Sequence, residues 1–255
     1  MINDQLNLKN DQHCSINVDH DKFYGVKATL NVWNPKVEKN YEFSLSQVWV
    51  IGRDLQNTLE AGWLVHPHLY GTVETRFFTF WTSDNYKTGC YNLECPGFVQ
   101  INRHNILASY LRPVSEYGGQ QYAIDLEIFK DKTTGNWWLR LQGVDMGYWP
   151  KELSPYLREG ADRVDFGGEV YYFRPGAHTS TQMGSGHFAA EGFKKSSFIK
   201  NAQVLDTSYV YRNPPHFYHL IDAERCYDIH VSSKTDGPWG QFFFFGGPGR
   251  SAKCT

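Results

Sequence analysis

Short runs of apolar or alternating residues, separated by turn residues, begin at Phe23 and continue almost to the end of the chain. Each run has the length of one β-strand, as in EFSLSQVWVIG, TRFFTFWTS and YAIDLEIFK. DLEIFK and WWLRLQG flank DKTTGN, whose glycine suits a tight turn, and this pattern predicts a β-hairpin. Many short strands joined by turns predict an all-β fold, either an antiparallel sandwich or a barrel.

Two segments depart from the strand pattern. Residues 1–22 are polar and rich in Asn and Asp, so we expect a disordered tail outside the fold. PKELSPYLREGADRV spaces its leucines at helical intervals and predicts one short helix near residues 150–162. Residues 23–255 contain neither an internal repeat nor a linker, and we expect them to form a single domain.

Composition agrees with a β-rich fold and narrows the possible partners. Phe, Trp and Tyr make up 16% of the chain, and these residues favour strands. A net charge of −2 without runs of like charge offers no attraction to nucleic acid or to an anionic membrane. No apolar run has the length of a membrane span, and MINDQLNLKNDQHC lacks an apolar signal core. We therefore expect a soluble protein, as a secreted enzyme without its leader would be.

Five cysteines bear on the redox compartment. Cys90 and Cys95 close a short loop, and Cys226 and Cys254 bracket the carboxyl-terminal stretch. This arrangement suits two disulfides in an oxidising compartment, and the alternative is five thiols in a cytosolic protein. Cys14 is left over in either case.

Two glutamates occupy unusual positions for charged residues. Glu60 in TLEAGWLVHP and Glu169 in VDFGGEVYYF each interrupt an otherwise apolar, strand-like run. A carboxylate on an apolar sheet face loses hydration unless it is paired or hydrogen-bonded. If both side chains face one concave surface, they share a proton, which gives a general acid and base device. The alternative is that both point outward into solvent.

Other candidate chemistry is weaker. HTSTQMGSGHF has small side chains that let a substrate backbone approach, and Gln182 offers an amide to a developing oxyanion, although an ordinary loop has the same composition. His66 and His68 have a spacing compatible with zinc, but no third ligand or C-x-x-C pair accompanies them. The chain lacks a Gly-x-Ser-x-Gly elbow, a P-loop and a dinucleotide fingerprint, so we expect neither a metal nor a cofactor.

A series of motifs gives a specific resemblance. SQVWVIG, AGWLVHPHLYG, FFTFWTSDNYKTGCYNLECPGFVQ, GYWPKEL, FGGEVYYF, HTSTQMGSGHFAAEGF and FFFFGGPG occur in this order. Together they resemble the catalytic domain of the plant neprosin family over residues 23–254. The resemblance implies an antiparallel β-sandwich of two packed sheets, jelly-roll-like. It also implies a secreted glutamic endopeptidase that cleaves on the carboxyl side of proline at acidic pH.

The resemblance assigns roles to individual residues. The two catalytic glutamates of the family fall on Glu60 in LEAGW and Glu169 in GGEV. The family's disulfide pattern implies the pairs Cys90–Cys95 and Cys226–Cys254, whereas Cys14 matches no family cysteine. The family's precursors carry a signal peptide and an amino-terminal pro-segment, so this chain resembles the processed catalytic part.

Four further residues are candidates for binding a proline-containing peptide or protein. Trp63 and Tyr70 lie near Glu60 in the sequence, and Tyr171 and Gln182 lie near Glu169. Aromatic faces suit the flat apolar ring of proline. Strand alternation places Tyr171 on the same face as Glu169, whereas Trp63 should point away from Glu60 unless a bulge intervenes.

Two other functions fit the same residues. Paired carboxylates and many aromatic residues also suit a glycoside hydrolase. A non-catalytic sandwich that binds carbohydrate or protein would use both glutamates as polar contacts only. Hydrolysis of a peptide, release of reducing sugar, or binding without hydrolysis distinguishes the three.

Overall fold

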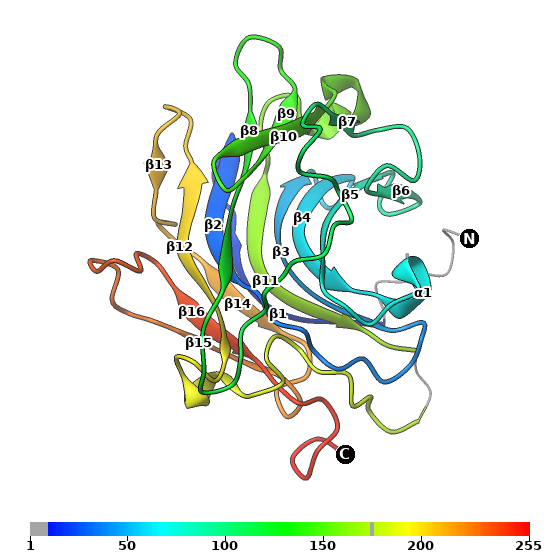
Figure 1. Cartoon of the computed structure of the whole chain (residues 1–255). Coiled ribbons are helices and arrows are strands. Elements are labelled where there is room, and N and C mark those ends of the chain that lie inside the picture. The colour runs from blue at the N-terminus through cyan, green and yellow to red at the C-terminus, as the bar shows by residue number, and fades with distance from the viewer. Residues whose placement is uncertain (1–9, 174–175) are drawn as a thin grey trace.

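A computed structural model describes residues 10–173 and 176–255 of the chain. Two antiparallel β-sheets pack face to face, and strands make up most of the regular structure (Figure 1). The predicted antiparallel β-sandwich is therefore confirmed. The predicted hairpin is also present, because the strands on either side of DKTTGN pair from Leu126 with Leu141 to Lys130 with Trp137.

The first sheet carries the candidate site and has seven strands. In spatial order they are β14 (Tyr218–Ile221), β1 (Asp11–Val18), β11 (Arg163–Tyr171), β3 (Phe43–Gly52), β4 (Asn57–Val65), β5 (Arg76–Ser83) and β6 (Thr88–Tyr91).

The second sheet has nine strands. Its main path is β15 (Asp228–Val231), β16 (Phe243–Gly246), β12 (Ser197–Leu205), β2 (Gly25–Asn31), β8 (Ala123–Lys130), β9 (Trp137–Leu141), β10 (Val144–Trp149) and β7 (Val99–Gln100), and β13 (Tyr211–Arg212) pairs with β12.

Apolar side chains fill the space between the sheets because alternate residues of each strand point inward. Ile16, Val48 and Phe166 from the first sheet and Leu30 and Ile128 from the second are fully buried in this core. A second apolar cluster covers the opposite, outer face of the first sheet. The first sheet is therefore buried on both faces, and a polar group on its outer face lies in a largely apolar environment.

The amino-terminal prediction is wrong for the residues that the structure describes. Residues 11–18 form β1, which pairs with β11 on one side and β14 on the other. Cys14, Ile16 and Val18 alternate along β1 and lie fully buried in the core. The polar residues between them, which suggested a tail, point to the outer face instead. Residues 1–9 lie outside the described part of the chain.

The helix predicted near 150–162 forms two short 3-10 helices, η2 (Lys151–Leu153) and η3 (Pro155–Leu157). Ser154 separates them with a non-helical backbone, and Pro155 lacks the N–H that a continuous helix would need. The α-helix of the described chain is α1 (Pro67–Tyr70), and η4 covers Ala189–Glu191. Among the described residues, no helix is long and apolar enough to span a membrane.

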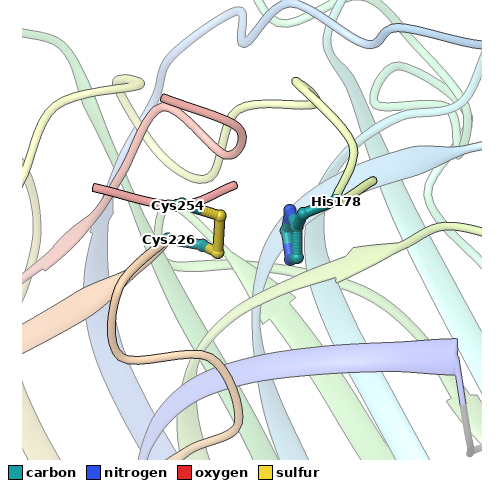
Figure 2. Close-up of side chains that lie close together, drawn as sticks. All are labelled: His178, Cys226 and Cys254. Atoms are coloured by element: carbon teal, nitrogen blue, oxygen red, sulfur yellow. A yellow bond between two sulfur atoms is a disulfide. The ribbon is translucent and has the colours of Figure 1, made fainter. Parts of the chain in front are cut away.

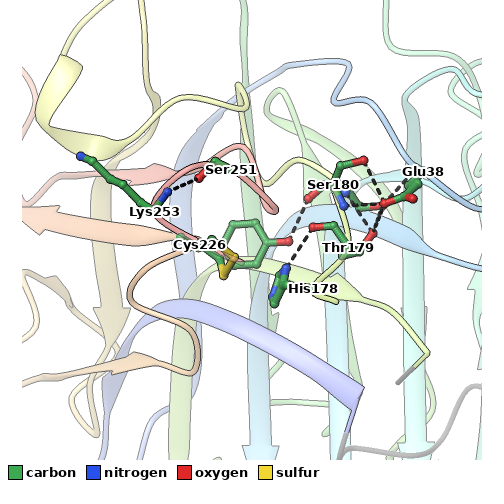
Figure 3. Close-up of a disulfide and its surroundings, with 10 residues drawn as sticks. Glu38, His178, Thr179, Ser180, Cys226, Ser251 and Lys253 are labelled. Carbon is green, nitrogen blue, oxygen red and sulfur yellow. Dashed lines mark hydrogen bonds between the residues drawn. A yellow bond between two sulfur atoms is a disulfide. The ribbon is translucent and has the colours of Figure 1, made fainter. Parts of the chain in front are cut away.

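Both predicted disulfides are present, Cys90–Cys95 and Cys226–Cys254. The second joins the carboxyl-terminal end to the segment that follows β14, beside His178 and Thr179 (Figure 3). Cys14 is a free, buried cysteine, and burial raises the pKa of its thiol well above the usual value.

Candidate active site

Glu60 and Glu169 lie on the same outer face of the first sheet. Glu169 of β11 is opposite Leu45 of β3, and Leu45 is opposite Leu64 of β4, four residues after Glu60. An even number of residues along a strand returns to the same face, so both carboxylates point the same way. The charge of Glu60 also contributes to raising the pKa of Glu169. The two groups are therefore within electrostatic reach of each other, as two catalytic carboxylates must be.

Three neutral donors surround Glu60, which is only 4% exposed. Thr58 and Tyr86 donate hydroxyl hydrogen bonds to its Oε1 at 2.7 and 3.0 Å, and Gln47 donates from Nε2 to its Oε2 at 2.9 Å. Burial raises the pKa of Glu60 to about 7, although each of these donors lowers it. At acidic pH the Glu60 carboxyl group is therefore protonated.

Besides Glu60, two ionisable residues of β1 lie next to Glu169. His13 lies directly opposite Glu169 in the strand register, with Nε2 3.7 Å from Oε2. Asp11, two residues along the same face, shares a hydrogen bond with the Glu169 carboxyl group. Burial and the charge of Asp11 raise the pKa of Glu169 well above its usual value, whereas His13 lowers it. Burial likewise raises the pKa of Asp11 to about 6.

Gln47 of β3 lies between two glycines in the sheet, Gly167 of β11 and Gly62 of β4. A Cβ atom on Gly62 would lie 2.0 Å from the carbonyl oxygen of Ser46, so no larger residue fits there without a shift of the strand. Gly167, Gln47 and Gly62 are neighbours across the three strands, midway between Glu169 and Glu60 along the strand direction. Because the two glycines have no side chains, only the Gln47 amide occupies this part of the sheet face.

A cavity of about 450 Å³ opens beside this group. His13, which contacts Glu169, and Tyr86, which contacts Glu60, both line it. The remaining walls combine acidic, basic and apolar side chains, namely Asp11, Gln12, Ser15, Trp49, Ile51, Leu55, Arg163, Asp165, Leu220 and Asp222. The cavity is large enough for part of a peptide next to the carboxylates.

Two of the four predicted binding residues lie on the face of the glutamates. Tyr171 packs in the outer apolar cluster and stacks on Phe43 at 5.5 Å, and Tyr70 of α1 packs against the same cluster. Tyr70 also accepts a hydrogen bond from Asn92 at 3.1 Å. Contact of either tyrosine with a substrate stays a prediction.

The other two predicted binding residues lie elsewhere. Trp63 is fully buried in the core between the sheets and donates its indole N–H to the carbonyl of Asn31 at 2.9 Å. No bulge interrupts the pairing of β4, so strand alternation holds and Trp63 points away from Glu60. Gln182 accepts the backbone N–H of Lys36 at 2.9 Å, and among its described contacts is neither glutamate.

Sequence reasoning missed five residues that surround the glutamates: Asp11, His13, Gln47, Tyr86 and Asp222. One signal was available for His13. The alternation Cys14, Ile16 and Val18 marks a strand with a core face, and this places His13 on the other face. Which strand lies next to β1 could not be inferred, because strand order depends on pairings between distant segments.

The described residues contain one group with the geometry of a metal site: His178, Cys226 and Cys254. Figure 2 shows that both sulfurs belong to the disulfide, with the imidazole beside it. Bonded sulfurs lack the thiolate charge that binds metals. His66 has no third ligand nearby among the described residues, and burial lowers its pKa to about 4.

A second hollow, of about 480 Å³, lies on the outer face of the second sheet. Its Arg140 contacts Glu127 in the same hollow at 3.1 Å and Asp145 beside it at 2.7 Å. Thr29 likewise donates to Asp125 at 2.6 Å. None of the residues that line this hollow has a described contact with Glu60 or Glu169, whereas His13 and Tyr86 of the first cavity do, so the face of the first sheet remains the candidate active site.

Comparison with known families identifies one family model. The sequence model of the neprosin family, described as Neprosin, matches residues 40–248, which is most of the chain and includes both glutamates. The chain belongs to the neprosin family. Membership in the neprosin family supports a glutamic peptidase as the class of enzyme.

Solved structures of peptidases align with most of the chain at low sequence identity. Scytalido-glutamic peptidase with a transition state analog inhibitor aligns with a TM-score of 0.49 and 11% identity, over 93% of the neprosin-family chain and 98% of its own. SCP-B, a member of the Eqolisin family in complex with the tripeptide Ala-Ile-His, aligns with a TM-score of 0.49 and 9% identity, over 93% and 98%.

Proposed function

We propose that this protein is a glutamic endopeptidase that works at acidic pH. The observation that carries the proposal is the placement of Glu60 and Glu169, both buried, on one face of a sheet beside a cavity. These are the residues that the family resemblance implies as catalytic. Two buried carboxylates with raised pKa values can exchange protons with a substrate at a pH where surface carboxylates are already ionised.

The proposed mechanism divides the work between the carboxylates. One of them, ionised, removes a proton from a water molecule, which attacks the carbonyl carbon of the scissile peptide bond. The other, protonated, donates a hydrogen bond to the carbonyl oxygen as negative charge develops there. A proton then passes to the leaving amine, and the peptide bond breaks. The reaction uses a single proton on the pair, so it requires a pH at which one group is ionised and one is not.

We further propose cleavage on the carboxyl side of proline, and secretion. The aromatic surface next to Glu169, which includes Tyr171 and Phe43, provides flat faces that suit a proline ring. Two disulfides support an oxidising, extracellular location.

Digestion of an unstructured, proline-containing protein tests the proposed function. Wild type, Glu60→Gln, Glu169→Gln and the exposed control Glu159→Gln are compared at about pH 4 and about pH 8.5, on either side of the Glu60 pKa of about 7. We expect wild type and Glu159→Gln to cleave at the lower pH, with prolines at the new carboxyl termini by mass spectrometry. Each active-site variant should lose at least about 100-fold in rate, the scale of acid–base catalysis.

Several outcomes would contradict the proposal. Cleavage that survives in both glutamine variants would remove the glutamates from the chemistry, and greater activity at about pH 8.5 would contradict the proton requirement. Release of reducing sugar without peptide cleavage would favour a glycoside hydrolase. New termini without proline would refute the proposed preference only.

A further inference from the structure

We infer that His13, held by Asp222, is a positioning residue that supplies a fixed positive charge beside Glu169 and so lets the catalytic pair lose its first proton at lower pH. The inference rests on the proposed function for its catalytic meaning. His13 belongs to β1, the strand whose polar sequence predicted a disordered tail, and it contacts both Glu169 and Asp222.

Asp222 holds His13 from both the main chain and the side chain. Its Oδ2 accepts the backbone N–H of His13 at 2.8 Å and lies 2.8 Å from the imidazole Nδ1. The backbone N–H of Asp222 donates to the carbonyl of His13 at 3.2 Å. These contacts fix the imidazole plane and place a proton on Nδ1, because a carboxylate accepts hydrogen bonds. The other ring nitrogen, Nε2, then points to Glu169.

The groups around His13 are predominantly acidic. Asp11 of its own strand, Glu169 of β11 and Asp222 beyond β14 each raise the pKa of His13, which reaches about 9 although burial opposes the charge. Farther away, the charge of His13 lowers the pKa values of Glu60 and of Asp165, the latter paired with the cation Arg163. The imidazole is therefore an imidazolium throughout the acidic range.

The two glutamates thus differ in what stabilises their charge. Only neutral hydroxyl and amide groups donate to Glu60, whereas an imidazolium lies beside Glu169. Asp11 and Glu169 share a hydrogen bond, which requires a proton on one of them, and His13 lowers the pKa of both. The first negative charge of the group therefore forms next to His13. Without the imidazolium, Glu169 and Glu60 would both ionise at higher pH, because the charge of His13 lowers the pKa of each carboxyl group.

The decisive variant is His13→Asn. An Asn side chain retains an N–H that can bond to Asp222, but it carries no charge and has no atom at the position of Nε2. His20→Asn is the matched control, since His20 is an exposed histidine close by, and its positive φ of 69° suits Asn. Profiles of kcat/KM against pH are measured for both variants and for wild type on one proline-containing peptide.

We expect the acidic limb of the His13→Asn profile to move to higher pH by one unit or more. This corresponds to about a tenfold loss of kcat/KM on the acidic limb, with a smaller loss near neutrality. His20→Asn should match wild type. If His13→Asn does not fold, Asp222→Asn is measured instead, and we expect a shift in the same direction. A uniform loss at every pH, or a shift of the alkaline limb alone, would overturn the inference.

A titration independent of activity separates this inference from the proposed function. The side-chain carboxyl carbons of glutamate are labelled with carbon-13, Glu169 is assigned by comparison with Glu169→Gln, and its ionisation is followed by NMR. We expect Glu169 to ionise at lower pH in wild type than in His13→Asn. If wild type cleaves no peptide, the proposed function fails, while this titration still decides the role of His13. Equal titration of Glu169 in both proteins would refute it.

Discussion

The raised pKa of Glu60 makes the stability of the fold depend on pH. Burial raises its pKa from 4.5 to about 7, so the folded chain holds a proton that the unfolded chain releases at lower pH. The resulting stabilisation is complete below about pH 4.5 and is lost as the pH rises through about 7. The raised pKa values of Asp11 and Asp165, both about 6, and of His13, about 9, act in the same direction. The lowered pKa of His66, about 4, has the opposite effect: it makes the fold less stable as the pH falls below about 6.5.

Replacement of Glu60 by Gln should therefore weaken the pH dependence of stability. Gln stays neutral, so the variant avoids the cost of ionising a buried carboxyl group. We expect the free energy of unfolding of Glu60→Gln to fall less than that of wild type between about pH 4 and about pH 8.5. The difference should be on the order of 3 kcal/mol, at about 1.4 kcal/mol per pKa unit. Urea denaturation at both pH values measures it, and an equal fall in Glu60→Gln and wild type would contradict the expectation.

Sequence reasoning found the two glutamates but not their surroundings. Glu60 and Glu169 were visible because each interrupts an apolar run in its own strand. Gln47 and Tyr86 are ordinary polar and aromatic residues in sequence, and only pairing between strands brings them to Glu60. Trp63 shows that nearness in sequence can mislead. It lies three residues after Glu60, an odd number, so its side chain points to the opposite face of the strand.

At the scale of elements, β1 is the largest departure from expectation. Its outer face is polar where it borders the candidate active site, and these polar residues make the core-facing alternation of Cys14, Ile16 and Val18 hard to recognise in the sequence. The strands that line the core on one face and an apolar cluster on the other, such as β3, were readily recognised. A strand that carries functional groups departs from the apolar pattern and is the hardest to predict.

Removal of residues 1–22 should prevent folding, although the sequence pattern suggests that this segment is dispensable. The deletion leaves β11 and β14 without their shared neighbour and exposes the core under Ile16. Deletion of residues 1–9 is the control, because it removes none of the described strand. We expect a cooperative melting transition for the shorter deletion and none for the longer one, by circular dichroism. A folded protein without residues 1–22 would contradict this account of β1.

At the scale of the whole molecule, two disulfides constrain loops of very different length. Cys226 and Cys254 are 28 residues apart in sequence, whereas Cys90 and Cys95 are 5 apart. The loop-entropy relation assigns about 3.5 kcal/mol to the longer loop and about 2 kcal/mol to the shorter one. The longer loop also begins only four residues after Asp222.

Replacement of each pair by serine tests this difference. We expect the variant without Cys226–Cys254 to lose more stability in urea than the variant without Cys90–Cys95, because its loop is longer. If the shorter disulfide proves the more important one, local packing at Cys90 rather than loop entropy determines the effect. The sequence spacing indicated both disulfides, whereas their placement relative to the active site required the fold.

The position of Asp222 has a consequence for the order of events during synthesis. His13 and Asp222 are 209 residues apart, and the two glutamates lie between them in the sequence. A ribosome therefore makes both glutamates long before it makes the carboxylate that holds His13. A growing chain that has reached only β11 contains Asp11, His13 and both glutamates but lacks Asp222. On this account the charge arrangement of the site is completed only once Asp222 has been made, so a nascent chain that has reached β11 still lacks it.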